Sequence, residues 1–588
     1  MKWNVSDSSE REAARLISEL RSAGTELSAP AARVLAARGY RDVGLVQRFF
    51  EPRLTDLHDP LLLAGMEAAV ARLLRAIERG EQVLLYGDYD VDGTSAIVIL
   101  MKGIELAGGR ASFHVPHRLR DGYGMRGEVV ERAAASGVSL IVSVDTGIRA
   151  HDVVRRASAL GIDTIVTDHH LPESSGEGEE LPPALAVLNP NRADCRYPEK
   201  NLCGAGVALK LVQALLERSS IEPSRRERLL DSFLKIAAIA TVADVVPLTG
   251  ENRVIVKRGL EGLGRVRNPG LRALLEVSGF DEGKAPSARE VAFRVAPRIN
   301  AAGRMDTASD VVEMFLTSDA ARARELAGKL HDLNQDRQQT EAEIARAIFE
   351  QCVGEPVSDR DAALVFAGEG WHRGVVGIVA SRVVERFHRP TFVLGIENGV
   401  AQGSGRSIAA FHLLEALERM PDLFSRFGGH RQAAGVSLAA GRIDEFRERL
   451  RADAGARLAL ADFEPELEID AEIRLEEIVD RAIADVLRLA PFGYGNPPPV
   501  FVARQLEVAE AAEVRNEKHL FLRVRCGNRW LRIKAWNFAG RVSEFTAGAR
   551  IDAAIQFEED AYSASRGYAP WQAVLKDARR AEAAAAIP

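Results

Sequence analysis

The sequence has no long hydrophobic run and few cysteines. No stretch of the 588 residues approaches the ~18 consecutive apolar residues of a transmembrane helix. The first ten residues lack the basic start and apolar core of a signal peptide, so we expect a cytoplasmic protein with no membrane segment. The 4 cysteines are scattered rather than closely paired, which argues against a zinc knuckle or a disulfide framework and favours reduced, structural thiols.

The chain also lacks an overall positive charge. Its net charge of −7 argues against non-specific coating of nucleic acid, although a whole-chain value can hide a local basic face. With 46% hydrophobic and 27% charged residues over 588 positions, the chain is too long for one hydrophobic core and is typical of a multidomain globular protein. Charge therefore has to be considered segment by segment.

Hydrophobic periodicity divides the chain into helical, mixed and strand-rich segments. Short apolar strands that alternate with helices predict a parallel sheet in the first half, and five short strands near the end favour a small barrel such as an OB-fold. We therefore predict an α/β multidomain protein. The expected segments are an N-terminal helical segment (1–79), a parallel-sheet domain (80–250), its helical extension (251–320), a connecting helix (321–355), a second α/β domain (360–455), an OB-fold barrel (465–577) and a frayed tail (578–588).

Three carboxylates alternate in the loop that follows the predicted strand Val83–Tyr86. In extended backbone, Asp88, Asp90 and Asp92 would share one face, where their like charges repel one another. A hard divalent cation such as Mg²⁺ or Mn²⁺ would neutralise them. The alternatives are a solvated acidic turn or an EF-hand-like calcium loop, but the strand before and the apolar helix after the motif argue against the second.

Further candidate ligands follow the next predicted strands. Asp145 ends the strand at 139–144, and Asp168-His169-His170 comes after the strand at 164–167. The carboxyl ends of parallel strands meet at one crevice, so these side chains should lie near the first three, and imidazole suits Mn²⁺ or Fe²⁺. Asp244 lies in an apolar stretch where an unpaired carboxylate is costly. A surface turn for the histidines and a helix N-cap for Asp244 are the alternatives.

A second set of residues offers contacts for phosphate. Guanidinium groups match phosphate oxygens in pairs, and glycine-rich turns present backbone N–H groups and hydroxyls to anions. Surface ion pairs and turns without a ligand are the alternatives. The candidates are Arg118, Arg298 and Arg304, the polar neighbour Asn300, Ser404, Arg406 and Ser407 in the turn predicted at 403–407, and His430 in the turn predicted at 428–430.

The predicted barrel carries a basic segment with interleaved aromatic residues. Between Arg515 and Arg541 the sequence has eight Lys or Arg and one Glu, a local net charge of 8 − 1 = +7. Aromatic rings beside cations on an exposed strand face can stack on unpaired bases, which favours single strands over duplex DNA. The alternative is a solvated face whose tryptophans pack under another domain. Strand alternation places Trp530, Arg532, Lys534 and Trp536 on one face, with Phe521 and Arg523 on the neighbouring strand.

Several motifs together resemble the DHH phosphoesterase superfamily. These are Asp88-Tyr-Asp-Val-Asp-Gly93, Val144-Asp-Thr-Gly147, Asp168-His-His-Leu-Pro172, Cys203-Gly-Ala-Gly206 and Thr241-Val-Ala-Asp-Val-Val-Pro247. Two further motifs, at 116–124 and 297–304, are similar to the RecJ family of single-strand-specific bacterial exonucleases within that superfamily. The motifs at 371–380 and 427–431 resemble the associated DHHA1 domain. The similarity extends from about residue 80 to the end of the barrel.

The resemblance implies a two-metal phosphodiesterase that attacks with water. It makes 80–250 a DHH domain and 360–455 a DHHA1 domain, and it places His170 next to the scissile phosphate, with Asp90 and Asp92 as further catalytic residues. It further implies 5′-to-3′ hydrolysis of single-stranded DNA in recombination and repair, by a monomer whose partners are a RecQ-type helicase and a single-strand-binding protein. The implied ligands of the two Mn²⁺ or Mg²⁺ ions are Asp88, Asp90, Asp92, Asp145, His169 and Asp244.

One residue separates branches of the superfamily. Members that act on small substrates have a metal-binding histidine four residues before the acid that matches Asp90, and this chain has Tyr86 there. That difference and the basic barrel favour the RecJ branch over a phosphodiesterase of short oligonucleotides or cyclic dinucleotides. The intact acids and histidines argue against a third possibility, a single-strand-binding scaffold without catalytic metals.

Overall fold

The computed structural model describes residues 1–6, 10–118, 120–122, 124–175 and 178–581, so most of the predicted tail lies outside the described residues. The chain forms two compact units. One contains Met1–Asp56, Pro247–Thr249 and the chain from Glu466 onward, and the other contains Leu57–Val246 and Gly250–Pro465. In the described part of the chain, no helix has the length and apolar character needed to cross a bilayer.

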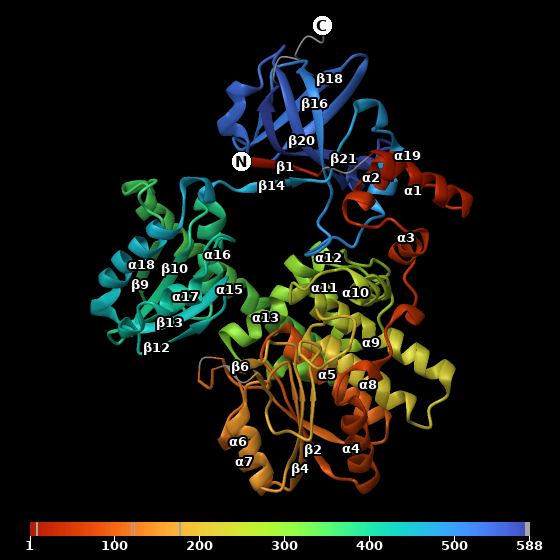
Figure 1. Ribbon diagram of the computed structural model, residues 1–588, viewed down its shortest axis with the longest axis vertical. Helices are drawn as coiled ribbons and strands as arrows, with labels where there is room; N and C mark the ends of the chain where they lie inside the picture. The colour runs from red at the N-terminus through yellow and green to blue at the C-terminus, as the bar shows by residue number, and fades with distance from the viewer. Residues whose placement is uncertain (7–9, 119, 123, 176–177, 582–588) are drawn as a thin grey trace. The chain divides into compact units, whose positions relative to one another are not determined.

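The larger unit is built around a parallel sheet with strand order β3-β2-β4-β5-β8 (Figure 1). Neighbouring strands all run parallel, and β2, β4 and β5 are almost completely buried, as expected for a sheet covered by helices on both faces. The carboxyl ends of β2, β4 and β5 therefore open onto a common edge. The strands are β2 (Gln82–Tyr86), β3 (Ala111–His114), β4 (Val138–Val144), β5 (Asp163–Thr167) and β8 (Ala186–Leu188), and a small hairpin is formed by β6 (Glu173–Ser175) and β7 (Gly178–Glu180).

Helices surround this sheet and continue from it toward the second sheet of the same unit. Helix α5 begins directly after the first acidic loop and packs against α8 and α9. The long helix α15 confirms the predicted polar helix with a thin apolar stripe. The helices are α4 (Met66–Arg79), α5 (Val91–Leu106), α6 (Gly127–Ala135), α7 (His151–Ala159), α8 (Gly204–Glu217), α9 (Pro223–Ala243), α10 (Gly250–Leu263), α11 (Pro269–Val277), α12 (Ala288–Glu290), the π-helical turn η3 (Val291–Val295), α13 (Ala296–Met305), α14 (Ser309–Leu316) and α15 (Ala320–Gly354).

The second sheet of the larger unit has the order β12-β13-β11-β10-β9 and is mixed. The prediction of a turn at 403–407 was wrong, because Gly403–Arg406 lie inside β11, paired on both sides with β10 and β13. The glycines permit this pairing, since a Cβ on Gly403 would lie 2.0 Å from the Val393 carbonyl oxygen. The elements are β9 (Leu364–Glu369), α16 (Val376–Phe387), β10 (Thr391–Glu397), β11 (Val400–Arg406), α17 (Leu413–Glu418), β12 (Arg426–Gly429), β13 (Ala433–Ala439) and α18 (Ile443–Arg457).

The smaller unit contains the predicted barrel. Its strands follow the order β15-β16-β20-β21-β19-β18-β17, and a further pairing of β16 with β18 closes the sheet. Apolar residues of α1 to α3 and α19 share one core with the inner face of this sheet. The elements are β14 (Glu466–Ile469), β15 (Ala471–Glu472), α19 (Asp480–Leu487), β16 (Val500–Val508), β17 (Glu513–Arg515), β18 (His519–Cys526), β19 (Arg529–Ala535), β20 (Arg550–Glu559), α20 (Ala561–Ser565) and β21 (Trp571–Arg580).

The N-terminal segment is not wholly helical. It begins with a strand, β1 (Lys2–Val5), which pairs in parallel with β14, and continues with α1 (Glu10–Ser22), α2 (Ala29–Ala37) and α3 (Val43–Phe50). The indole N–H of Trp3 donates to Asp577 of β21, 2.8 Å away. The pairing joins residues more than 460 positions apart, so the local periodicity of the segment carried no signal for it.

Candidate active site

The acidic loop and the strand ends of the larger unit bring the predicted ligands together. Carboxylate and imidazole atoms form groups whose members lie within 4.8 Å of one another, and His169 and Asp145 belong to two of these groups each. The His169 Nε2 lies 3.2 Å from Asp145 Oδ1, 3.7 Å from Asp92 Oδ2 and 3.8 Å from Asp244 Oδ2. The groups are Asp145, His169 and His170; Asp92, His169 and Asp244; and Asp88, Asp90 and Asp145.

The backbone is extended at Asp90 but helical from Val91 onward, which corrects the expectation of side chains that alternate through to Asp92. Asp90 is the N-cap of α5, and its Oδ1 accepts from the backbone N–H groups of Asp92 and Gly93 at 2.9 and 3.0 Å. Asp92 therefore lies in the first turn of the helix. There its two oxygens accept from the N–H groups of Gly204 and Ala205, at 2.6 and 2.8 Å, at the N-terminus of α8.

Tight backbone packing holds the acids close to one another. Asp145 has a positive φ of 58°, a left-handed conformation that costs free energy in a residue with a Cβ and is typical of functional sites. A Cβ on Gly204 would lie 2.7 Å from the Asp145 Cβ, and one on Gly93 would lie 2.7 Å from the backbone nitrogen of Asp88. These two glycines are required because a side chain at either position would push an acid out of the cluster.

The cluster is electrostatically costly as it stands. Burial and the neighbouring carboxylates raise the pKa of Asp88 and Asp145 well above the usual range, and burial together with Asp92 and Asp90 raises the pKa of Asp244 to about 9. Burial lowers the pKa of His169, which keeps the imidazole neutral as a ligand must be. The Oδ1 atoms of Asp88 and Asp145 are buried without a hydrogen-bond donor. A divalent cation fits this donor set of buried carboxylates and neutral imidazole.

His170 differs from His169 because it has its own carboxylate. Its Nδ1 lies 2.7 Å from Oδ1 of Asp168, which also accepts from the backbone N–H groups of both histidines. Burial would lower the pKa of His170, but the hydrogen bond to Asp168 and the charge of that carboxylate outweigh it and raise the pKa. His170 is therefore biased toward its protonated form, as a donor to a phosphate oxygen requires.

Three partly buried arginines, Arg118, Arg304 and Arg406, lie near one another beside the carboxylates. We call this group the arginine pocket. The Arg118 guanidinium lies over the Tyr89 ring at 4.9 Å, and Arg304 donates to the Gly374 carbonyl at 2.9 Å. Burial and the nearby charges of Arg118 and Arg406 lower the pKa of Arg304 to about 10, and burial and Arg118 lower that of Arg406. No carboxylate of the described residues lies within ion-pair distance of any of the three. Such a pocket is suited to a phosphate group.

Other predicted contacts lie near this pocket. A Cβ on Gly377 would lie 3.1 Å from a terminal nitrogen of Arg406 and 3.5 Å from the hydroxyl of Ser404, so these two side chains converge over α16. The Asn300 Oδ1 accepts from the Val91 N–H at 3.2 Å, next to the acidic loop. Ser404 therefore lies beside Arg406, and Asn300 lies beside the acidic loop, and their contacts with substrate stay predictions.

Two predicted contacts have other partners. Arg298 donates to Nδ1 of His331 at 3.2 Å and to the Arg294 carbonyl, so the structure does not bring it into the arginine pocket. The Ser407 hydroxyl donates to the Phe411 carbonyl at 2.8 Å, which uses it in the turn after β11. Neither partner lies at the carboxylate cluster.

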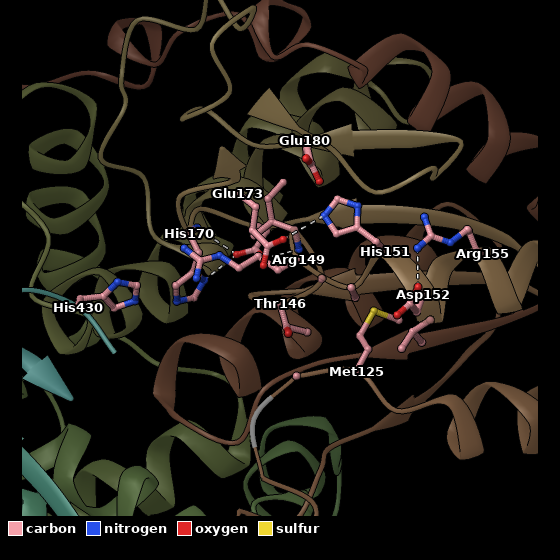
Figure 2. Close-up of a pocket in the computed structure, with 16 residues that line it drawn as sticks. Met125, Thr146, Arg149, His151, Asp152, Arg155, His170, Glu173, Glu180 and His430 are labelled. Carbon is pink, nitrogen blue, oxygen red and sulfur yellow. Dashed lines mark hydrogen bonds and ion pairs between the residues drawn. The ribbon is translucent and has the colours of Figure 1, made fainter. Parts of the chain in front are cut away.

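A cavity of about 690 Å³ opens beside His170 (Figure 2). His430 lines it together with His170, Thr146, Arg149 and His151. Burial, Arg149 and His170 lower the pKa of His430. Arg149 also donates twice to the Leu171 carbonyl, at 3.1 and 3.0 Å, and so holds the loop that carries the two histidines.

The smaller unit displays the aromatic and basic face expected of the barrel. Trp530 and Trp536 are 49% and 41% exposed. The Arg523 guanidinium lies 4.5 Å from the Trp530 ring, and Phe521 lies 6.4 Å from the Trp536 ring. Cross-strand pairs place Phe521 opposite Lys534 and Arg523 opposite Arg532, so β18 and β19 contribute to one surface.

This face is less positive than its sequence suggests. Arg515 pairs with Glu513 of its own strand, Arg523 with Glu510 of the loop before β17, Arg525 with Glu507 of β16, and Lys534 with Asp560. The local net charge counted between 515 and 541 omitted these acids because they come from β16, β17 and the loops. Among the described residues of this segment, Lys518, Arg529 and Arg532 form no ion pair, so they carry its uncompensated positive charge.

The sequence prediction missed how the predicted residues are oriented. Asp168, a candidate ligand from the sequence, instead holds His170, and Arg149 and the N–H groups of Gly204 and Ala205 act on predicted residues rather than as ligands. Asn191 similarly donates to the His169 carbonyl at 2.6 Å. The motif Cys203-Gly-Ala-Gly206 was the available signal for the N-terminus of α8, and Asp168 adjoined the histidine pair, but nothing local marked Arg149 or Asn191.

Known families match most of the chain. The model of the DHH family, N-terminal domain, matches residues 82–241, that of the DHHA1 domain matches 360–455, and that of the RecJ OB domain matches 469–576. The single-stranded-DNA-specific exonuclease RecJ of Dickeya dadantii is 41% identical over 494 residues, which are 80% of this chain and 83% of that protein. RecJ of Bacillus subtilis is 35% identical over 554 residues, 94% of this chain and 68% of that protein.

Solved structures agree with these matches. RecJ from Thermus thermophilus in complex with Mn²⁺ superposes with a TM-score of 0.82 at 31% identity, over 99% of this chain and 80% of that one. The same protein in complex with Mg²⁺ gives a TM-score of 0.75 at 29% identity, over 99% of this chain and 79% of that one. The α/β multidomain fold with a terminal OB barrel, predicted from the sequence, is confirmed.

Proposed function

The chain belongs to the RecJ family of DHH phosphoesterases, and on this premise we propose that it degrades single-stranded DNA from the 5′ end and releases 5′-mononucleotides. The observation that carries the proposal is that the carboxylate cluster and the arginine pocket lie next to each other. Helix α13 connects them, because its Asn300 contacts the acidic loop and its Arg304 belongs to the arginine pocket. A strand end with a terminal phosphate meets both requirements: an anion to hold and a phosphodiester bond to cleave nearby.

The proposed ligands are those that the structure groups around His169 and Asp145. Two divalent cations held there by Asp88, Asp90, Asp92, Asp145, His169 and Asp244 would lower the pKa of an attacking water and neutralise charge on the phosphate. The N–H groups at the N-terminus of α8 orient Asp92 and partly oppose the rise in its pKa that burial causes, and Asp90 serves both as a cap of α5 and as a carboxylate facing the site.

The chain's own residues supply positioning and protons. Arg118, Arg304 and Arg406 hold the terminal phosphate, and the hydroxyl of Ser404 donates to it. His170, kept protonated by Asp168, donates its proton to an oxygen of the scissile phosphate. His430 lines the same cavity near His170 and contacts the same nucleotide. The barrel face of Phe521, Trp530 and Trp536 binds the rest of the strand.

The cellular role follows from the family. We propose that the protein is a cytoplasmic monomer that resects single strands in recombination and repair, with a RecQ-type helicase supplying the strand and a single-strand-binding protein as a further partner. The exposed, aromatic barrel face supports a strand substrate over a dinucleotide, because a dinucleotide has no third base to stack there.

A time course on end-labelled strands tests this function. The same oligonucleotide is labelled at its 5′ or its 3′ end and incubated with Mn²⁺ and either the wild type or Asp90→Ala. Immediate release of labelled mononucleotide from the 5′ label, absent in the variant, is expected. Cleavage confined to very short oligomers would identify a small-substrate phosphodiesterase, and binding without hydrolysis in any divalent metal would identify a scaffold protein.

A further inference from the structure

One helix of the larger unit contains a π-turn with an exposed aromatic residue. Helices α12, η3 and α13 run on from one another between Ala288 and Met305, and the Ala296 N–H donates to the Val291 carbonyl, the i to i+5 pattern of a π-helix. Pro297 accounts for this turn. Proline has no N–H to donate to the carbonyl of Phe293, four residues earlier, and its ring clashes with that carbonyl in a regular α-helix.

The π-turn displays Phe293 while its neighbours are buried. Phe293 is 75% exposed, whereas Val291 and Val295 on either side are 0% exposed. Among the described residues no ring stacks on Phe293 and no cation lies over it. The adjacent Arg294 instead lies 4.2 Å from the Phe280 ring and pairs with Glu290. Turns of this kind occur often at functional sites, and this one places a phenylalanine ring in solvent.

Phe293 shares a helix face with two residues of the site. Asn300 follows it by seven residues and Arg304 by eleven, spacings that return to nearly the same side of a regular α-helix, and the wider π-turn rotates Phe293 by part of a turn from that line. At 1.5 Å per residue, Phe293 lies about 10 Å along the axis from Asn300 and about 16 Å from Arg304. Arg304 is at the arginine pocket and Asn300 is beside the acidic loop. The helix therefore runs from the pocket past the acids to Phe293.

We propose that Phe293 stacks on an unpaired base of the bound strand, within the first five nucleotides from the terminal phosphate. The position follows from length, since about 16 Å spans at most ~5 steps of ~3.4 Å between stacked nucleotides. The ligand is a base rather than an apolar peptide, because Phe293 lies on the same helix as Arg304, which is proposed to bind phosphate, and the polar residue Asn300. This inference rests on the proposed function and assigns a positioning residue to it. Phe293 holds the strand in line with the cluster and touches no reacting atom.

Binding without turnover gives the first test. Wild-type protein in EDTA is titrated with 5′-phosphorylated 12-nucleotide strands that carry the fluorescent base 2-aminopurine at one of the first five positions or at the tenth. Stacking on Phe293 quenches 2-aminopurine at one of the first five positions but not at the tenth. Phe293→Ala removes that quench and weakens binding about tenfold, and Phe293→Trp retains both. Phe293→Leu keeps an apolar side chain but has no ring, so it should lose the quench as Phe293→Ala does. Unchanged quenching in either variant overturns the proposal.

Steady-state kinetics give the second test. For the 12-nucleotide strand with Mn²⁺, Phe293→Ala raises KM about tenfold with kcat unchanged, because uniform binding is lost. For a dinucleotide neither constant changes, because the substrate ends before it reaches Phe293. Val353→Ala, at another exposed apolar residue of the same unit, is the matched control and leaves both substrates unaffected. A fall in kcat on the dinucleotide would overturn the positioning role. A wild type that hydrolyses no strand would refute the proposed function, and the quenching experiment would still report on the stacking.

Discussion

Charge is arranged in opposite ways in the carboxylate cluster and on the barrel face. Asp88, Asp92 and Asp145 are buried beside one another, and the arginine pocket next to them has no carboxylate partner among the described residues. On the barrel, Arg523 and Arg525 are exposed and each meets a glutamate. Buried charge without a partner costs several kcal/mol, whereas exposed pairs contribute about 0–1 kcal/mol. The first arrangement therefore points to ligands, and the second to a surface whose specificity comes from its aromatic rings.

The largest expected effect comes from neutralising one acid of the cluster. Asp145→Asn keeps the shape of the side chain and removes a buried charge, so kcat on single-stranded DNA should fall at least about 1000-fold. In EDTA the same variant should melt at or above the wild-type temperature, because it relieves repulsion among the carboxylates. Calorimetry and a nuclease assay on one preparation measure both.

Asp152→Asn is the matched control for that change. Asp152 lines the cavity beside His170, but its side chain is 93% exposed and pairs with Arg155. It should retain full activity. Equal losses in the two variants would mean that burial of Asp145 has no special consequence.

The arginine pocket gives the next largest effect. Arg304→Ala should reduce kcat/KM about 10- to 100-fold on strands with a 5′-phosphate, because hydrogen bonds to a charged group are lost, and much less on strands with a 5′-hydroxyl. Arg298→Ala lies on the same helix but outside the pocket, and it should not alter the ratio of the two rates. If the ratio of kcat/KM on 5′-phosphate strands to kcat/KM on 5′-hydroxyl strands is the same in both variants and the wild type, Arg304 does not bind the terminal phosphate.

The pH dependence of the metal-free protein sharpens the comparison further. The folded pKa of Asp244, about 9, is above its ordinary value of 3.8, so the folded state binds this proton more tightly than the unfolded state. Its contribution to stability is therefore lost progressively as pH rises from about 4 toward 9. In EDTA the wild type should melt at a higher temperature at pH 6 than at pH 8.5, and Asp244→Asn should show a smaller difference. If the melting temperatures of the wild type and Asp244→Asn change equally with pH, the pKa of Asp244 is not raised by burial.

Removing the aromatic rings of the barrel should have a more moderate effect. The double variant Trp530→Ala, Trp536→Ala should raise the Kd for a 20-nucleotide strand about 5- to 30-fold, because stacking contributes about 1–3 kcal/mol per base. Hydrolysis of a dinucleotide should be unchanged. Fluorescence anisotropy measures the first and product analysis the second. Normal affinity for the long strand would mean that these exposed rings do not bind bases.

The smallest effect comes from releasing a paired arginine. Glu507→Gln frees Arg525 from its ion pair and should tighten strand binding by up to about fivefold at low salt, with less effect at high salt. The control is Glu468→Gln. Glu468 belongs to the same unit, but it contacts Asn4 rather than an arginine of the barrel face. Equal affinity for the strand in the two variants at low salt would show that the ion pair of Arg525 with Glu507 does not weaken strand binding.

The sequence predicted those parts of the site that depend on local patterns. Strand ends carrying Asp88, Asp145 and His169 could be recognised because a short apolar run followed by an acid has a defined place in a parallel sheet. The face of Trp530 and Trp536 followed from alternation in one strand. These predictions required only the period of the element and its order in the chain.

Other features depend on contacts between distant segments, which no local period reveals. The support of Asp92 by Gly204 joins residues 112 positions apart, and the pairing of β1 with β14 joins still more distant ones. The stretch around Gly403 was predicted as a turn because glycine favours turns, but close approach of β10 requires glycine in a strand there. The ion pair of Arg525 with Glu507 likewise formed across strands and reduced the charge that was counted along the chain.

The most direct test of the central claim is the number of Mn²⁺ ions bound per chain, measured by titration with detection of free Mn²⁺ by electron paramagnetic resonance. Wild type, Asp145→Asn and Glu507→Gln are compared in the same buffer. We expect two ions in the wild type and in Glu507→Gln, and fewer in Asp145→Asn. If the wild type binds no ion, or if Asp145→Asn binds as many as the wild type, then the buried carboxylates do not form a metal centre.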